Sequence, residues 1–266
     1  MNKGVILTIE DGVARIDINN PPLNILDLWV RQELMRCFEI LKDSDQARVL
    51  VLRGTGGRAF SVGSNVREFP FDRGRAGGRD KVVFEQRLHD LLEGLPQVTI
   101  AVLDGYVLGG GCELMMPCDL RIASDRTVLG FPEVKIGGFP CSGGTQRLLR
   151  LVGPTAAKEL LLFGEQITAQ RAEQLGLVTR VVPVEQLDQT VEEMVQKLVQ
   201  LPWQSLIACK SCVNAGMLSP QEGARAEVEF FTAIFPTHDM REGIRAFLEK
   251  RPPVFDHSRA PLQREV

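Results

Sequence analysis

The sequence predicts an α/β fold over residues 1–200 and a helical region over residues 201–266, from three observations. Short apolar runs of strand length alternate with amphipathic helical segments up to about residue 200. Glycine-rich turns separate many of these segments. After Pro202 only helical spacing of apolar residues remains. The repeated strand–strand–helix order is consistent with a solenoid-like spiral, although no internal sequence repeat establishes it.

The N-terminal third supplies the first strands and helices. Residues 5–10 and 13–19 are expected to form a hairpin around Asp11-Gly12, a dipeptide that suits a tight turn. Apolar residues at positions 30, 34, 38 and 41 mark one face of a helix over residues 27–41. The run RVLVLR at 48–53 predicts a buried strand. Residues 71–80 predict a mobile loop, and residues 81–93 predict a helix that ends at Gly94 and Pro96.

The remaining elements follow the same reasoning. Helices are expected over residues 155–163, 168–175 and 184–199, with a strand over residues 177–182. Beyond Pro202 the spacing predicts three more helices, over residues 203–215, 221–235 and 239–250. The sequence RPPVF then ends the last helix, because proline cannot continue it.

Bulk composition argues for an ordinary globular protein. The chain has 266 residues, of which 44% are hydrophobic and 24% charged, and its net charge is −3. This balance gives no support for a nucleic-acid partner. No apolar run has the length of a membrane span, and the N-terminus enters strand-like alternation without the composition of a leader. We therefore expect a cytoplasmic protein with neither a membrane nor a nucleic-acid partner.

The cysteines and histidines give little sign of metal chemistry. The six cysteines are scattered, which favours reduced buried thiols. Cys209-x-x-Cys212 has ligand-like spacing but no second pair, and the three histidines form no cluster. We therefore expect no metal site and no Ser-His-Asp or Cys-His mechanism.

Residues 99–148 are the stretch best suited to chemistry. A strand-like run at 99–103 leads to three glycines at 109–111 and then to an apolar helix-like run at 112–118. Glycines in this position let the backbone approach a ligand, and the first N–H groups of the helix can stabilise an oxyanion. Glu113 lies in the apolar first turn, where desolvation would raise its pKa, and Glu133 follows further along. An acidic residue there can also simply compensate the helix dipole.

Two segments of this stretch resemble one family closely. The texts IAVLDGYVLGGGCELMMPCD and LGFPEVKIGGFPCSGGTQRL resemble the signature of the enoyl-CoA hydratase/isomerase family, the crotonases. Weaker similarity continues through LLFGEQITAQRAEQLGLVTRVVPVEQL and MREGIRAFLEKRPPVF. The resemblance implies a crotonase-like spiral of ββα units with CoA and the active site in residues 1–200. It also implies that residues 201–266 are a helical oligomerisation region that builds homotrimers, often paired into hexamers.

The resemblance also implies a set of site residues. The text RAFSVGSNVR at 58–67 is similar to the family element AFxAGxDLxE, which implies an oxyanion hole formed by the N–H groups of Ser64 and Gly110. Ser64-Asn65 replaces the usual Ala-Asp, and this puts the shape of the acyl pocket in question. Hydratases of the family are similar in having both glutamates, whereas simple isomerases often keep only the second. We assign water activation chiefly to Glu113 and protonation of Cα chiefly to Glu133.

Contacts to CoA and to the acyl group are implied in the same way, at positions drawn from four parts of the chain. For Phe247 the competing interpretation is a core residue, and for Lys250 it is a solvated charge; the resemblance instead directs both toward a neighbouring subunit's ligand. Cys141 stands where a small glycine is common in the family. The expected substrate-binding residues are Leu23, Asn24, Ser61, Val62, Gly63, Gly109, Pro132, Cys141, Phe247 and Lys250.

These assignments lead to one preferred function and two alternatives. We expect an enoyl-CoA hydratase, a hydro-lyase that adds water reversibly to a 2-enoyl-CoA through a stabilised thioester enolate, with CoA as substrate carrier and no other cofactor. The first alternative is an isomerase, a dehydratase or an enzyme of C–C bond cleavage on a specialised acyl-CoA, which the departures at Ser64, Asn65 and Cys141 favour. The second is a non-catalytic RNA-binding or scaffolding relative, which the near-neutral charge and the glutamate pair disfavour.

Overall fold

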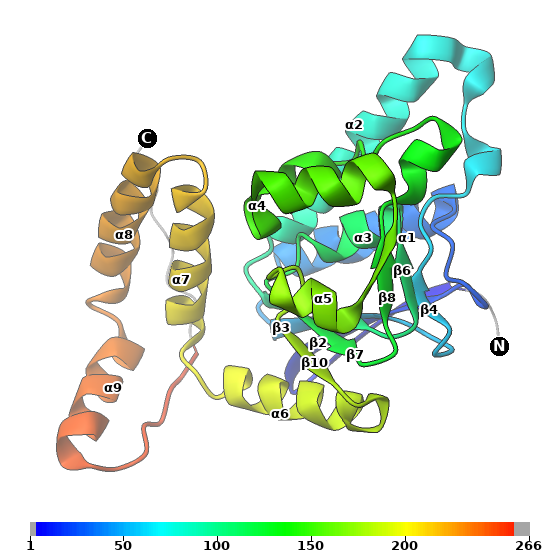
Figure 1. The fold of residues 1–266 in the computed structure, drawn as a ribbon. Helices are drawn as coiled ribbons and strands as arrows, with labels where there is room; N and C mark the ends of the chain where they lie inside the picture. The colour runs from blue at the N-terminus through cyan, green and yellow to red at the C-terminus, as the bar shows by residue number, and fades with distance from the viewer. Residues whose placement is uncertain (1–3, 258–266) are drawn as a thin grey trace.

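The computed structural model describes residues 4–257, and Figure 1 shows an α/β body with a helical arm at its C-terminal end. The larger sheet of the body has the strand order β1-β2-β3-β5-β7-β10. β1 and β2 form an antiparallel hairpin, and the later neighbours pair in parallel. The strands are β1 (Gly4–Glu10), β2 (Gly12–Asn19), β3 (Ala47–Gly54), β5 (Val98–Leu103), β7 (Leu120–Ser124) and β10 (Arg180–Val182).

A second, smaller sheet makes the fold a spiral. Its strand order is β4-β6-β8-β9, with β4, β6 and β8 parallel and β9 antiparallel. The chain passes from β3 to β4, from β5 to β6 and from β7 to β8, so each turn contributes one strand to each sheet. A helix closes each turn before the next strand of the large sheet. The four short strands are β4 (Ala59–Ser61), β6 (Tyr106–Leu108), β8 (Val128–Gly130) and β9 (Gln166–Thr168).

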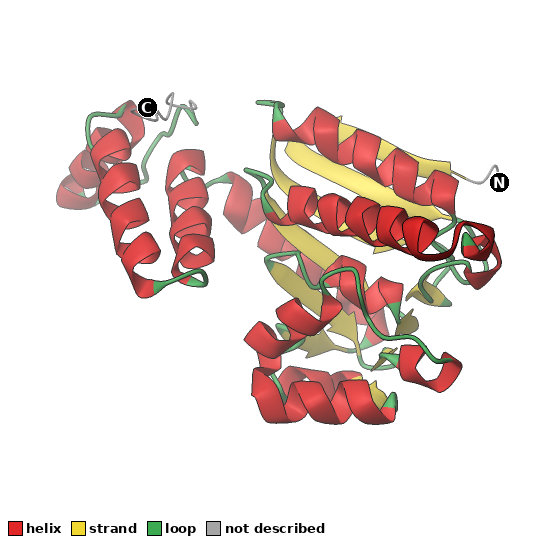
Figure 2. Ribbon diagram, turned by 90° about the horizontal axis from the view of Figure 1, so that it is seen from above, coloured by secondary structure: helices red, strands yellow, loops and turns green. Residues whose placement is uncertain are grey.

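The central strands of the large sheet are buried on both faces, as their near-continuous apolar sequences predict. Along β3, Leu50 and Leu52 join the main core, whereas Val49 and Val51 join a second cluster on the opposite face. This division follows from the alternation of side chains along a strand. Helices α1 (Leu28–Lys42), α2 (Gly74–Glu93) and α3 (Gly110–Met115) contribute to the main core, and α6 (Leu187–Val199) covers the second cluster. Figure 2 shows α1 and α2 side by side above the sheet.

The connections between these elements include short 3₁₀ turns and one interrupted helix. Helix α4 (Gly144–Phe163) contains Gly153 with φ 77°, followed by Pro154, which cannot donate the helical hydrogen bond. The kink there splits α4 into two segments. The other connecting elements are η1 (Val66–Glu68), η2 (Phe71–Arg73), η3 (Pro132–Ile136), α5 (Ala169–Gln174) and η4 (Val184–Gln186).

The C-terminal arm consists of α7 (Trp203–Gly216), α8 (Pro220–Ile234) and α9 (His238–Glu249). It extends away from the body in Figures 1 and 2. Helices α7 and α8 cross closely where a Cβ on Gly223 would lie 2.9 Å from the Cα of Gly216. Large apolar side chains of the arm are exposed in the single chain, among them Val213, Leu218, Val228, Phe231, Phe235, Phe247 and Leu248.

Most predicted strands and helices are present with small differences in their bounds. The helix predicted over residues 155–163 is the second segment of the longer α4, and two other places differ in kind. Residues 71–80 do not form a loop: η2 is followed by α2, which begins at Gly74. Gly77 lets the first turn of α2 pack against the preceding segment, because a Cβ there would lie only 2.6 Å from the carbonyl oxygen of Pro70. The strands of the second sheet were not predicted, because each has only three residues and therefore no readable periodicity.

Two further expectations can be compared with the structure. The six cysteines are free thiols, but only Cys37, Cys112 and Cys118 are buried, so the expectation of burial was wrong for the other three. Within residues 4–257, no helix has the length and apolar character needed to cross a membrane.

Candidate active site

The oxyanion-hole residues predicted from the sequence lie against each other. Gly63 has φ 88°, and a Cβ on it would lie 2.7 Å from the backbone nitrogen of Gly110. The nitrogen of Ser64 in turn lies 3.4 Å from the position of a Cβ on Gly110. Within the described residues, neither the Ser64 N–H nor the Gly110 N–H donates to a backbone carbonyl. Two free N–H donors side by side are the arrangement that stabilises a developing oxyanion.

The other two glycines of the triplet are required by close contacts. Gly109 has φ 53°, and a Cβ there would come within 3.0 Å of the carboxyl oxygen Oε1 of Glu133. A Cβ on Gly111 would lie only 2.2 Å from the carbonyl oxygen of Ser61. The triplet therefore brings the start of α3 against two neighbouring segments at once, which a side chain would prevent.

Glu113 is a buried carboxyl group held by two backbone donors. Its side chain lies in the first turn of α3 and the residue is only 5% exposed. Its Oε1 accepts the N–H of Ser142 at 2.8 Å and the N–H of Gly144 at 3.0 Å. Burial raises the pKa of Glu113 to about 7, and the nearby Glu133 contributes in the same direction, while the two N–H donors oppose the rise. This carboxyl group is therefore tuned for proton transfer near neutral pH.

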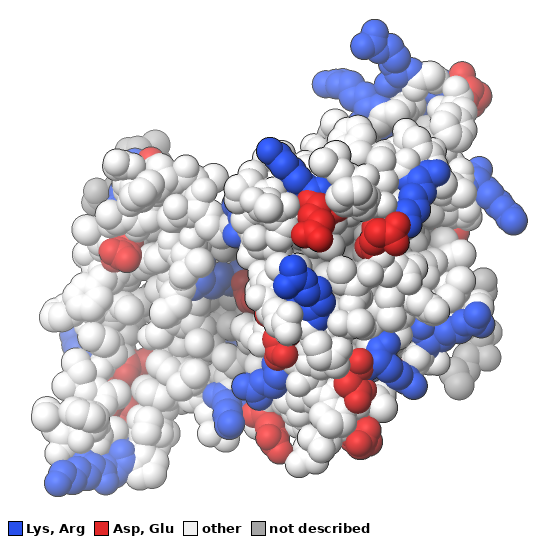
Figure 3. Space-filling view, viewed as in Figure 1, with Lys and Arg blue, Asp and Glu red and all other residues white. Residues whose placement is uncertain are grey.

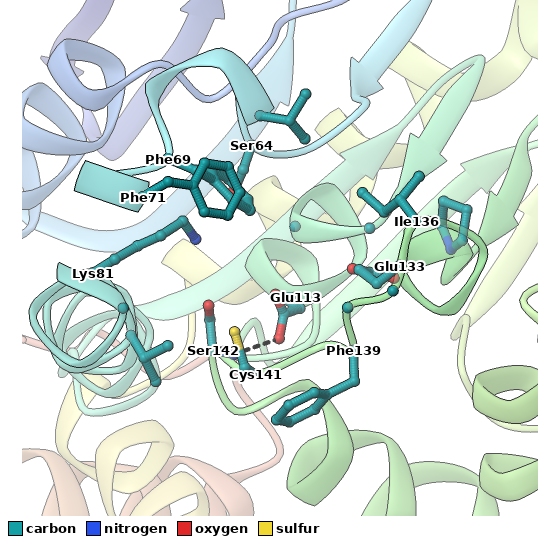
Figure 4. A pocket seen from close by; sticks show the side chains of 18 of the residues that line it. Ser64, Phe69, Phe71, Lys81, Glu113, Glu133, Ile136, Phe139, Cys141 and Ser142 are labelled. Atoms are coloured by element: carbon teal, nitrogen blue, oxygen red, sulfur yellow. Dashed lines mark hydrogen bonds between the residues drawn. The ribbon is translucent and has the colours of Figure 1, made fainter. Parts of the chain in front are cut away.

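Glu133 approaches the same space from a different element. It belongs to η3, and Figure 4 shows the Glu113 and Glu133 side chains directed into one cavity. Burial raises the pKa of Glu133, and no described residue offers a hydrogen bond to its buried Oε2. Its own backbone N–H and the charge of Lys81 oppose this rise. Both carboxyl groups therefore have raised pKa values, and Glu113 accepts two backbone N–H donors from a neighbouring segment.

Three successive turns of the spiral deliver these groups. Ser64 follows β4, Gly110 and Glu113 follow β6, and Glu133 follows β8. Because β4, β6 and β8 are parallel neighbours, the segments that follow them meet at one edge of the small sheet.

The cavity between these groups has a volume of about 590 Å³. Apolar side chains from η2, α2, η3 and the segment after η3 form much of its wall, including Phe71, Val82, Ile136 and Phe139. The Nζ of Lys81 also lines it, 4.6 Å from the ring centre of Phe69. A mostly apolar space with a few polar groups at one place is typical of a small-molecule site.

Six of the residues expected at the site line this cavity in addition to the two glutamates: Val62, Ser64, Gly109, Gly110, Pro132 and Cys141. Four others hold the surrounding backbone instead. Asn24 donates to the carbonyl oxygens of Thr55 and Ala59, and Ser61 accepts the N–H of Gly63. The carbonyl of Leu23 accepts the N–H of Val62.

The remaining two expected residues, Phe247 and Lys250, lie on the arm and do not line the cavity of their own chain. Phe247 is 82% exposed, which excludes the interpretation as a core residue in the single chain.

Sequence reasoning missed the donors to Glu113 and the charges behind them. The N–H groups of Ser142 and Gly144 belong to the glycine-rich turn at 137–144, but nothing local shows that they face Glu113. Lys81 and Glu85 have the i, i+4 spacing of an ion pair, which was a readable signal. The packing of Arg31 against Glu85 could not be read, because these residues are 54 positions apart.

The two interleaved sheets and this glutamate-lined cavity define the crotonase class of fold. The crystal structure of an enoyl-CoA hydratase from Bacillus anthracis superposes with a TM-score of 0.87 at 32% identity, covering 95% of this chain and 99% of that one. A short-chain-enoyl-CoA hydratase of Clostridium acetobutylicum is 36% identical, over 93% of this chain and 95% of its own length. A mitochondrial enoyl-CoA hydratase of Pongo abelii is also 36% identical, with 91% and 83% covered. The chain belongs to the enoyl-CoA hydratase/isomerase family, whose sequence model matches residues 8–258.

Proposed function

We propose that this chain is an enoyl-CoA hydratase, which adds water reversibly across the double bond of a 2-enoyl-CoA. The observation that carries the proposal is that Glu113 and Glu133 meet in one cavity beside the N–H groups of Ser64 and Gly110. The similarity to proteins named enoyl-CoA hydratases supports it.

In the proposed reaction the thioester carbonyl oxygen lies between the N–H groups of Ser64 and Gly110. Ionised Glu113 takes a proton from water as the water oxygen bonds to Cβ, and negative charge moves onto the thioester oxygen. Protonated Glu133 then gives its proton to Cα as the enolate collapses. Removal of one oxyanion-hole donor in other enzymes costs about 10²–10³ in rate, so the oxyanion hole is expected to supply a large share of the catalysis.

The proposal includes no metal and no redox cofactor, because the atoms and protons balance with water and two carboxyl groups alone. CoA serves as the carrier of the substrate. The residues proposed to hold it are those named from the sequence, with Asn24, Ser61 and Gly63 acting through the backbone that they support. Residues 1–200 are proposed to carry the site, and residues 201–266 to carry the oligomer contacts.

The side chains that line the cavity support an acyl group other than plain crotonyl. Phe69, Phe71 and Val82 line it with apolar surface, and Ser64 and Cys141 replace smaller residues usual in the family. A specialised acyl group also keeps open an isomerase or another reaction of the same enolate. A nucleic-acid-binding relative gains no support, because Figure 3 shows basic and acidic side chains interspersed on the described surface of that face.

We also propose that the chain assembles as a homotrimer or as a dimer of trimers. The arm of α7, α8 and α9 exposes apolar side chains that a partner subunit would cover. In such an assembly Phe247 and Lys250 would approach the CoA bound to a neighbour.

The first experiment follows the loss of the enoyl-thioester absorbance with crotonyl-CoA and with longer or bulkier 2-enoyl-CoA substrates. The parent should turn over at least one of them, and Glu113→Gln should lower the rate by at least about 10²-fold. A folded parent that binds CoA but hydrates none of the substrates would refute the hydratase assignment. Equal rates on crotonyl-CoA and bulkier substrates would remove the argument for a specialised acyl group.

A further inference from the structure

A buried polar network lies directly behind the cavity wall, centred on Glu85 of α2. The Glu85 side chain is 5% exposed, and its two oxygens accept from Lys81 Nζ at 2.8 Å and 2.7 Å. The guanidinium of Arg31, on α1, donates to the same carboxylate. Burial opposes the ionisation of Glu85, but Lys81 and Arg31 together overcome it and lower the pKa. Glu85 is therefore a buried anion between two cations.

Ser142 connects this anion to the proposed base. Its hydroxyl donates to Glu85 Oε2 at 2.5 Å, while its backbone N–H donates to Glu113 Oε1 at 2.8 Å. Its carbonyl oxygen lies 2.7 Å from Nδ1 of His89, which must donate because a carbonyl only accepts. Burial lowers the pKa of His89 to about 4, so this histidine is neutral near pH 7. The hydroxyl and the carbonyl of Ser142 therefore both have buried hydrogen-bond partners, and these contacts orient its N–H toward Glu113.

Arg31 connects the same anion to the oxyanion hole. Besides its contact with Glu85, it donates to the hydroxyl of Ser64 at 3.1 Å. The N–H of Ser64 is one of the two proposed oxyanion donors. Glu85 thus contacts Ser142, which donates to the proposed base, directly, and it reaches Ser64 through Arg31. Buried ion pairs of this kind often contribute little net stability.

We propose that Glu85 is a positioning residue for the reaction. It holds Ser142 so that the N–H meets Glu113, and it holds Arg31 so that Ser64 presents its N–H to the thioester oxygen. This proposal rests on the proposed hydratase function for its kinetic consequences, but the link between Glu85 and Glu113 can be measured without turnover.

The negative charge of Glu85 and the N–H of Ser142 have opposite effects on the ionisation of Glu113. The negative charge of Glu85 opposes ionisation of Glu113. The amide oxygen of a glutamine at position 85 can still accept from the Ser142 hydroxyl, so the loss of negative charge decides the direction. Glu85→Gln should therefore make Glu113 easier to ionise. The Ser142 N–H favours the ionised form, so loosening it with Ser142→Ala should make Glu113 harder to ionise. The groups that face Glu113 and its donors, element by element, are Arg31 of α1, Lys81, Glu85 and His89 of α2, Glu133 of η3, and Cys141 beside Ser142.

The kinetic test compares Glu85→Gln and Ser142→Ala with the parent. A matched control is Glu93→Gln, which removes another carboxylate of α2 that pairs with an arginine, Arg147, at 2.6 Å. We expect kcat to fall roughly 10–100-fold in Glu85→Gln with little change in KM, as for loss of a hydrogen bond to a charged group. The acid limb of the kcat/KM profile should move to lower pH in Glu85→Gln and to higher pH in Ser142→Ala. The control should keep the parent profile.

The second readout is the carboxyl ¹³C signal of Glu113, labelled with ¹³C-glutamate and assigned by its loss in Glu113→Gln. Its titration should move in the same two directions as the acid limb. If Glu85→Gln does not fold, Glu85→Asp tests the proposal instead. It keeps the negative charge, so its Glu113 titration should not move to lower pH as predicted for Glu85→Gln. Folded variants that keep the parent kcat and the parent titration would overturn the proposal. A parent without hydratase activity whose Glu113 titration still responds would refute only the hydratase function.

Discussion

Gly144 lies so close to Glu113 that it has room for a hydrogen bond but none for a side chain. Its N–H donates to Oε1 of Glu113 at 3.0 Å, and a Cβ on Gly144 would come within 2.6 Å of the same oxygen. The Gly144 N–H can therefore reach the carboxyl group of Glu113 only because residue 144 has no side chain. We expect activity to depend on this contact.

Gly144→Ala should lower kcat by about 10²-fold, because the new methyl group displaces the Glu113 carboxylate from its donors. Steady-state kinetics and a thermal melt measure the two effects separately. Gly243→Ala is the control, since its Cβ would make only an ordinary contact of 3.5 Å with Phe255 on the arm. Parent-like kcat in Gly144→Ala would show that Glu113 does not depend on this placement.

The pH dependence of kcat/KM should have an acid limb near pH 7. The pKa of Glu113 is raised to about 7, and the proposed base works only when ionised, so the rate falls as pH drops through that value. The proposed acid Glu133, whose pKa burial also raises, must be protonated, so the rate should also fall toward alkaline pH. Because the two carboxyl groups interact, the apparent pKa values of the profile describe the pair and not either glutamate alone. A rate that stays flat as the pH falls from about 8 to about 5 would contradict the assignment.

Glu113→Gln should stabilise the fold at alkaline pH while it removes activity. The pKa of this carboxyl group rises from its ordinary value of 4.5 to about 7 in the folded protein. A raised carboxyl pKa means that the native state favours the protonated form, so stability is lost as pH rises through that window. The variant should therefore gain up to about 3 kcal/mol in free energy of unfolding at about pH 8, and almost nothing at about pH 4. Urea unfolding at both pH values measures the difference, and an equal change at both would oppose this origin.

The proposed assembly predicts that a charge on the exposed face of α8 separates the subunits. Phe231 is 53% exposed in the single chain and lies 5.7 Å, ring centre to ring centre, from Phe235. Phe231→Glu should shift the protein from trimer to monomer in sedimentation equilibrium, because a charge buried at an apolar interface is costly. Glu229→Gln, on the same helix, should leave the assembly intact. A parent that sediments as a monomer would refute the trimer itself.

The sequence was most informative where a local constraint decides the structure. Asp11 and Gly12 both adopt positive φ, of 51° and 81°, as a two-residue hairpin turn requires. The ends of the helices predicted in the arm lie within one residue of the observed ends. These segments are long enough for the helical spacing of apolar residues to be read from the sequence. The wrong prediction of a mobile loop at 71–80 has a local cause. Its glycines weaken helix propensity, but Gly77 packs so closely against Pro70 that no side chain would fit there.

The site was predictable only in part. The glutamates and the oxyanion residues came from the family resemblance, and the structure brings them to one cavity. The donors from Ser142 and Gly144, and the Glu85 network, depend on segments far apart in sequence: Glu85 and Ser142 are 57 positions apart. No periodicity or composition encodes such a contact, because it arises only when the turns of the spiral stack.

The delivery of one chemical group by each turn has a consequence for how this scaffold can change its reaction. The proposed oxyanion donor of Ser64, the proposed base Glu113 and the proposed acid Glu133 follow three different short strands, and each strand belongs to its own turn of the spiral. An exchange of the segment after β8 would alter the proton donor without touching the enolate-stabilising backbone. The reaction could therefore be redesigned toward isomerisation or bond cleavage by exchanging one segment at a time. Each such segment runs from a short strand to the helix that follows it.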